Sequence, residues 1–288
     1  MTETSRDDWS PADDPYATAV SEAQWWQRAA HLAILRLRGR DDLVGGFSSR
    51  QIDARQLVLA LRQILAAEKL EQLALEELGI DPRVGAELAK ARQRFEEALP
   101  GIKNMRDALT HFDEWSRGEG RGAQRERVKA GAALRDVARD FWGFGYDPTT
   151  ETVAMGPYKI EVTAADQAAR ELSWAIYMAA RAVDEKRIAE LRSAVVSALT
   201  SAGLLPGGDA ILISPGQDLR ISISLKADAA NPDDGLSDLA TSIAAVLTDA
   251  RLRLVAPSEP QSKDTAERLA RGETLQVLPV SWWLCVGS

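Results

Sequence analysis

The chain has a single cysteine, Cys285, and only two histidines among its 288 residues. One cysteine excludes an intramolecular disulfide and any metal cluster that several thiolates would hold. The residues around Cys285 are apolar (Trp282, Trp283, Leu284 and Val286). This setting favours a thiol packed in a core over a nucleophile.

Long apolar runs and an excess of positive charge are also missing. No stretch reaches the roughly 18 apolar residues that a membrane-spanning helix needs. The first residues lack the basic segment followed by an apolar run that marks a secretory signal. We therefore expect a cytoplasmic protein with no membrane partner. The net charge of −8 argues against binding of nucleic acid by the whole surface, so such binding requires a local basic patch.

Several common catalytic motifs are absent as well. The sequence has no Gly-x4-Gly-Lys-Ser/Thr phosphate loop, no His-Glu-x-x-His zinc helix and no Gly-x-Ser-x-Gly nucleophile elbow. His111 is followed by Asp113 and Glu114, but positions i and i+2 diverge on a helix and do not favour a shared metal ion. We therefore expect neither a metal site nor a cofactor.

The hydrophobic pattern predicts an α+β protein. An acidic segment with Pro11 and Pro15, residues 1–20, is expected to lack fixed structure. Residues 21–183 are expected to form an N-terminal antiparallel helical bundle with a β-hairpin insertion, and residues 184–288 a small α+β domain. The bundle helices are predicted over residues 21–38, 50–78, from Pro82, 101–115, 125–140 and from Thr163, and the short strands over 141–145, 151–155 and 158–162.

Apolar residues alternate with polar ones in the second half, which is typical of a sheet with one wet face. Strands are predicted over residues 210–214, 219–226, 252–255 and from Thr274, with helices over 185–202, 235–250 and 264–271. Pro279 interrupts the last strand, which argues for an edge strand or a bulge. No family is recognised in this half, so its role stays open between partner binding, ligand sensing and covering the bundle.

The helix over residues 101–115 contains the most informative stretch, Arg106-Asp-Ala-Leu-Thr-His111. Ile102, Met105, Leu109 and Phe112 recur at i, i+3, i+7 and i+10, which predicts one buried helix face. Asn104, Asp107, His111 and Glu114 form a polar stripe on another face. Asp107 and His111 are i, i+4 neighbours, so a hydrogen bond between them is expected to hold the imidazole.

An arginine and a histidine at this spacing supply the parts of a metal-free phosphate site. Histidine can give or take a proton near neutral pH, and arginine presents a permanently charged fork to phosphate oxygens. On a straight helix Arg106 and His111 are about 140° apart. To act together, Arg106 must curl round, the helix must be distorted, or a second chain must complete the site. A surface helix with a solvated polar stripe explains the same residues without any catalysis.

The stretch resembles the HEPN family of helical ribonucleases and nucleotide-binding modules, whose mark is Arg, a polar residue, and His after four to six positions. The resemblance covers residues 20–183 and rests mainly on residues 101–117. It implies a metal-independent endoribonuclease, a toxin or defence effector, that works as a homodimer and is controlled by an antitoxin or regulatory protein. His111 would move protons, Arg106 would stabilise charge on phosphorus, and Asp107 would orient His111. A non-catalytic dimeric module that binds a protein or nucleotide is the alternative.

A basic segment directly follows this motif. Residues 117–129 contain five basic side chains and two glutamates, which leaves three positive charges in excess. Gly118, Gly120 and Gly122 predict a mobile loop, and such a loop suits an RNA backbone; a solvated connection between helices is the other interpretation. The residues predicted to bind RNA are Asn104, Arg117, Arg121, Arg125 and Arg127.

Overall fold

The computed structural model describes residues 10–12, 14–201, 211–214, 219–223, 252–255 and 280–286. Backbone contacts divide the chain into two compact units, residues 1–183 and 184–288. The described part is α+β, with helices and small antiparallel sheets. No helix within it is long and apolar enough to cross a membrane.

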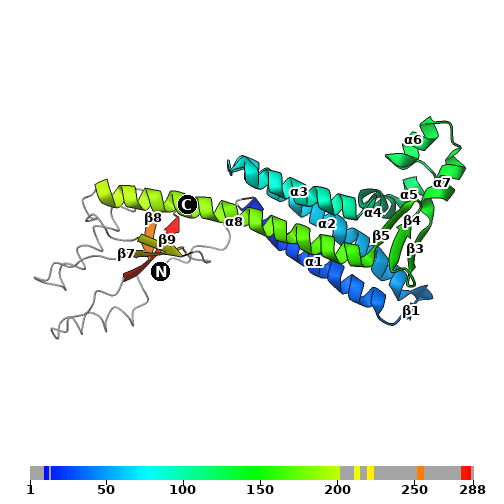
Figure 1. Ribbon diagram of the computed structural model, residues 1–288, viewed down its shortest axis with the longest axis horizontal. Helices are drawn as coiled ribbons and strands as arrows, with labels where there is room; N and C mark the ends of the chain where they lie inside the picture. Colours follow the sequence, from blue (N-terminus) through cyan, green and yellow to red (C-terminus); the bar gives the residue numbers. More distant parts are fainter. Residues whose placement is uncertain are drawn as a thin grey trace, which may run out of the picture. The chain divides into compact units, whose positions relative to one another are not determined.

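The first unit is an antiparallel helical bundle (Figure 1). Its long helices are α1 (Pro15–Arg38), α2 (Ser49–Glu77), α3 (Pro82–Ala98) and α8 (Val162–Ser201), the last of which continues into the second unit. A short hairpin of β1 (Leu43–Val44) and β2 (Phe47–Ser48) joins α1 to α2. Residues 15–20 were expected to lack fixed structure, but they form the first turns of α1, where Pro15 occupies an early helical position.

The local signals at the start of α3 act as expected. Asp81 precedes the helix, and its carboxylate accepts a hydrogen bond of 2.9 Å from the Arg83 amide. Pro82 follows at a position where a missing N–H costs nothing. Because this cap and proline act within one turn, the beginning of α3 could be predicted from the sequence.

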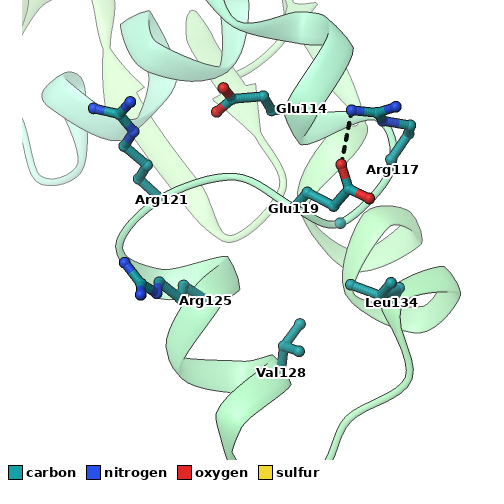
Figure 2. A pocket seen from close by; sticks show the side chains of 8 residues that line it. Glu114, Arg117, Glu119, Arg121, Arg125, Val128 and Leu134 are labelled. Carbon is teal, nitrogen blue, oxygen red and sulfur yellow. Dashed lines mark ion pairs between the residues drawn. The ribbon is translucent and has the colours of Figure 1, made fainter.

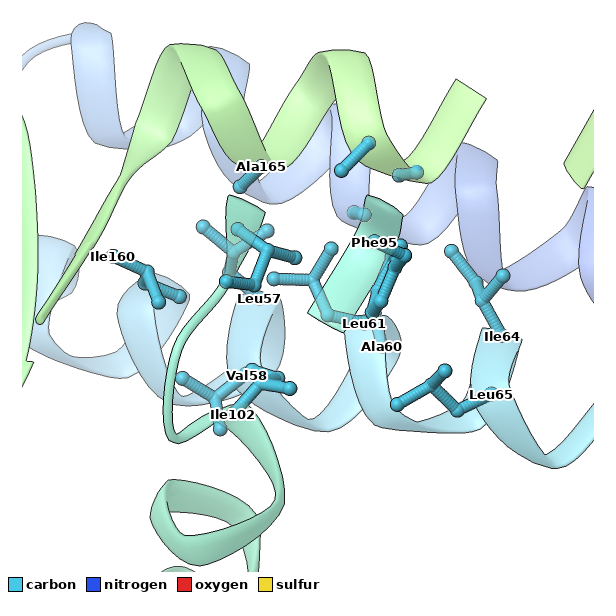
Figure 3. Close-up of a cluster of buried hydrophobic side chains, with 14 of the residues drawn as sticks. Leu57, Val58, Ala60, Leu61, Ile64, Leu65, Phe95, Ile102, Ile160 and Ala165 are labelled. Carbon is cyan, nitrogen blue, oxygen red and sulfur yellow. The ribbon is translucent and has the colours of Figure 1, made fainter. Parts of the chain in front are cut away.

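The core is organised around α2, which contacts α1, α3 and α4. Leu57, Leu61 and Ile64 of α2 pack against side chains from several other elements (Figure 3). These partners are Phe95 of α3, Ile102 of α4 (Ile102–Thr110), Ile160 of β5 (Tyr158–Glu161) and Ala165 of α8. A fully buried leucine in such a cluster typically stabilises a fold by about 2–5 kcal/mol relative to alanine.

A small layer completes one end of the bundle. It contains α5 (Phe112–Trp115), α6 (Ala123–Lys129), α7 (Leu134–Trp142), and an antiparallel sheet of β3 (Phe144–Asp147), β4 (Thr152–Met155) and β5. The hairpin and third strand are present as one sheet, with Phe144 paired to Met155 and Met155 to Tyr158. The first strand was predicted over 141–145 but runs over 144–147, because Phe141 and Trp142 end α7. The single helix expected over residues 125–140 is two helices, separated near Gly131, whose φ is +93°.

The second unit contains an antiparallel sheet in the order β6-β7-β9-β8. The strands are β6 (Ile211–Ser214), β7 (Leu219–Ile223), β8 (Leu252–Val255) and β9 (Val280–Val286). Pro279 was expected to mark the last strand as an edge strand or a bulge. The described strand β9 begins at Val280 and pairs with both β7 and β8, so it is not an edge strand. Several predictions lie outside the described residues: the helices over 235–250 and 264–271, and residues 274–279 of the last strand. The Cys285 side chain and residues 1–9 also lie outside them.

Candidate phosphate-binding site

The predicted motif helix is broken at its histidine. Helix α4 ends at Thr110, and His111 has φ −116° and ψ 45°, outside the helical region. The His111 carbonyl accepts hydrogen bonds from the Glu114 and Trp115 amides, at 3.1 and 3.0 Å, and so begins α5. Of the expected apolar face, Ile102 and Met105 are buried, but Phe112 is 62% exposed. The break explains this, because it turns Trp115 inward in place of Phe112.

Tertiary packing accounts for the break. The Trp115 side chain is 2% exposed and meets the Phe141 ring edge-on, with centroids 6.2 Å apart. Phe141 in turn lies 6.2 Å from the Tyr158 ring. These aromatic partners are distant in the sequence. Burying the indole among them stabilises the fold more than continuing the helix by one turn would.

Arg106 and Asp107 form an ion pair with each other. Arg106 Nη1 lies 2.9 Å from Asp107 Oδ1, and both side chains are more than one third exposed. This pair takes the place of the expected hydrogen bond between Asp107 and His111. The two positions are linked only through the backbone, since the His111 amide donates to the Asp107 carbonyl at 2.8 Å. The His111 imidazole is exposed, and no side chain in the described part of the chain hydrogen-bonds to it.

A buried glutamine holds the basic loop in place. Gln124 is fully buried, donates through Nε2 to the Trp115 carbonyl at 3.1 Å, and accepts from the Gly120 amide at 2.8 Å. Gly120 lies against the Trp115 ring. The loop is therefore packed, in contrast to the mobile loop expected from its glycines. No local signal marks Gln124 in the sequence, because its role depends on Trp115 and Gly120 being brought to it.

Gly118 fixes the approach of this loop to α7. Its φ is +78°, and a Cβ there would lie 2.3 Å from the Leu134 carbonyl oxygen. We expect Gly118→Ala to lower the free energy of unfolding by about 3 kcal/mol or more, since backbone strain adds to overlap. Gly131→Ala is the matched control, because Gly131 also has positive φ but has open space around it, and should lower it by about 1–2 kcal/mol. Urea unfolding of both variants measures this; equal losses would show that the close approach has no energetic role.

The packed loop forms one wall of a pocket of about 490 Å³ (Figure 2). Arg117, Arg121 and Arg125 line it together with Glu114, Gly118, Glu119, Val128 and Leu134. Arg117 Nη2 pairs with Glu119 Oε2 at 2.7 Å. Figure 2 shows this pair on one side of the pocket and the Arg121 and Arg125 side chains on the other. Within the described residues, neither Arg121 nor Arg125 forms an ion pair with an acidic side chain, so both guanidinium groups are open to an anion.

The other two residues predicted to contact RNA lie elsewhere. Arg127 Nη2 pairs with Asp140 of α7 at 3.1 Å and does not line the pocket. Asn104 is half-buried and hydrogen-bonds with Tyr158. Burial raises the pKa of the Tyr158 phenol, and this bond with Asn104 acts in the opposite direction. Asn104 thus joins α4 to β5, and Arg127 joins α6 to α7.

The second histidine does not complete the site. His31 of α1 lies with its Nδ1 3.3 Å from Asp166 of α8, and within the described residues no hydrogen bond or ion pair joins it to residues 106–111. No group of three or more metal-binding side chains occurs in the part of the chain that the structure describes.

The chain was compared with known proteins. No family model, no curated protein and no solved structure matches it. The chemistry available lies in an exposed imidazole at a helix break, the Arg106–Asp107 pair, and a pocket with two open guanidinium groups that neither Arg106 nor His111 lines.

Proposed function

We propose that this chain is a metal-independent endoribonuclease of HEPN-like type, acting in the cytoplasm as a toxin or defence effector. The observation that supports this most directly is the pocket lined by Arg117, Arg121 and Arg125, which follows the motif in the chain but is not lined by Arg106, Asp107 or His111. Glu114 lines the pocket, and its amide hydrogen-bonds to the His111 carbonyl. Along the chain, α5 separates His111 from Arg117, the first of the guanidinium groups that suit the phosphates of an RNA strand.

The proposed reaction needs only proton transfer and charge stabilisation. The 2′-oxygen attacks the adjacent phosphorus while its proton passes to a base, the bond from phosphorus to the 5′-oxygen breaks, and that oxygen takes a proton. The products are a 2′,3′-cyclic phosphate and a 5′-hydroxyl. An imidazole can act at either proton-transfer step. A guanidinium group stabilises the charge on the phosphorane, which Arg106 would do once a phosphate replaces its partner Asp107.

One imidazole at a site supplies either the base or the acid, so we propose that two chains share the site. His111 is exposed in the single chain, and a two-fold homodimer would place both copies of the motif in one cleft. Light scattering at micromolar concentration should therefore give the mass of a dimer. A monomer, or a dimer whose His111 residues lie on opposite outer surfaces, would contradict this proposal.

The pocket arginines provide a test of RNA binding. We expect the double substitution Arg121→Ala and Arg125→Ala to weaken binding of single-stranded RNA about tenfold or more. Loss of two phosphate contacts should also reduce the slope of log affinity against log salt by about 1.4. Fluorescence anisotropy at several salt concentrations measures both quantities.

The matched control removes two positive charges elsewhere. Arg62 and Lys69 lie on α2 and do not line the pocket. Their double alanine variant has the same net charge as the pocket variant but should keep the wild-type affinity to within about twofold. Equal weakening by both double variants would show that only net charge matters, and the pocket would lose its assigned role.

A specific observation favours a second function, that of a non-catalytic module which binds RNA or a protein partner. Asp107 neutralises Arg106, and no side chain of the described residues orients His111. On this alternative the pocket still binds phosphate, but wild-type protein produces no cyclic phosphate from any RNA. An antitoxin or regulatory protein would be a partner under either function.

A further inference from the structure

A second groove with a different chemistry runs along the bundle between α1 and α8. Figure 1 shows these helices side by side, and the His31–Asp166 contact joins them. The groove has a volume of about 290 Å³. Its walls are formed by Gln24, Gln27 and Arg28 of α1 and by Arg170, Ser173, Trp174 and Tyr177 of α8. None of these residues lines the pocket formed by Arg117, Arg121 and Arg125.

Aromatic side chains dominate the α8 wall. Trp174 is 62% exposed, although tryptophan is well buried on average. The Trp174 and Tyr177 rings have centroids 5.3 Å apart and planes tilted by 35°. Tyr177 therefore supports the indole from one side, while most of the indole stays open to solvent. A supported, open ring face is the arrangement on which nucleic-acid bases stack.

The polar side chains of the groove suit a nucleotide better than an apolar peptide. Gln24 and Gln27 carry amides that can donate and accept at once, as the edge of a base requires. Arg28 is exposed, and among the described residues no acidic side chain pairs with it. Arg170 Nη2 pairs with Asp166 Oδ2 at 2.9 Å, so Arg28 is the cation most available to a phosphate.

We propose that the α1/α8 groove is a base-stacking site for single-stranded RNA, with Trp174 as the stacking platform and Arg28 as a phosphate contact. The inference rests on the proposed function, because it assigns a second part of the same substrate. Base stacking tolerates any sequence, since every base has a flat face, and requires an unpaired strand. The groove would therefore select single-stranded over duplex RNA without selecting a sequence.

Binding is measured in the His111→Ala background, so that cleavage cannot interfere. The probe is a fluorescein-labelled oligoadenylate of about 12 nucleotides, within the length that such sites cover. Adding Trp174→Ala should weaken its binding about 5- to 150-fold. Adding Trp174→Phe should restore most of the affinity, because a ring remains. An exposed tryptophan on the same bundle, Trp25 (66% exposed), is the matched control, since it does not line the groove.

Three results would overturn the inference. The first is unchanged affinity in the Trp174→Ala variant, which would leave the groove to a protein partner. The second is equal weakening of binding by Trp25→Ala. The third is a parent protein that does not bind the probe. The proposed function fails separately, if wild-type protein binds RNA through Trp174 but leaves it uncleaved. Because Trp174 is largely exposed, all variants should keep the parent melting temperature to within a few degrees.

Discussion

His111→Ala should lower the rate of RNA cleavage by about 10²- to 10⁴-fold, the usual contribution of general acid–base catalysis. The imidazole is exposed at the junction of α4 and α5 and belongs to no hydrophobic contact of the core. Its removal should therefore change the free energy of unfolding by roughly 0.5 kcal/mol or less. Arg106→Ala should cause a comparable loss of cleavage, because it removes the proposed stabiliser of charge on phosphorus.

The measurement uses cellular RNA as substrate, with melting temperatures recorded for every variant. His31→Ala is the matched control, since it removes the only other histidine of the chain, which contacts Asp166. That variant should cleave as fast as wild type. Undiminished cleavage by His111→Ala would exclude the mechanism. An inactive His111→Ala protein that has also unfolded would instead assign the residue a structural role.

The second large effect is expected from the substrate. RNA in which the 2′-hydroxyl at the cleavage position is replaced by hydrogen should not be cleaved at all, because the attacking oxygen is gone. The same oligonucleotide should still bind, since the pocket arginines contact phosphates, which both substrates carry. Cleaved RNA should end in a 2′,3′-cyclic phosphate, identified by mass spectrometry.

Chelation supplies the control for this prediction. Imidazole and guanidinium groups supply the proton transfers and positive charge that the reaction needs, so cleavage should continue at the same rate in excess EDTA. Loss of cleavage in EDTA, with recovery on adding magnesium, would replace the proposed mechanism with a two-metal or metal-hydroxide one. Cleavage of the deoxy-substituted substrate would contradict attack by the 2′-hydroxyl.

Several elements could be predicted because their signals are local. Asp81 and Pro82 start α3 through contacts within a single turn. In β4 the buried Val153 and Met155 alternate with half-buried residues, and Ile160 is buried between exposed residues of β5, so this period marks two strands. The first strand was predicted over 141–145 but runs over Phe144–Asp147, so its buried residue, Tyr146, was missed. Four arginines of the basic loop were predicted to bind RNA. They are close in sequence, and three of them, Arg117, Arg121 and Arg125, line one pocket.

Helix α8 shows how a local pattern can mislead. Two helices were predicted, one starting at Thr163 and one over 185–202, but one helix runs from Val162 to Ser201. No glycine or proline interrupts this segment, so nothing in the backbone ends a helix there. The change in character near residue 184 reflects the start of a second compact unit and not the end of a helix.

The sequence by itself determined the α+β class, the helical bundle, and the presence of one histidine beside a cluster of arginines. Tertiary structure decided how these groups are presented. The motif helix breaks at His111 because Trp115 is buried against Phe141, which in turn contacts Tyr158. Gln124 holds the loop by hydrogen bonds to the backbone of Trp115 and Gly120. These contacts join residues that no helical or strand period relates, and their energy exists only once distant segments have packed together.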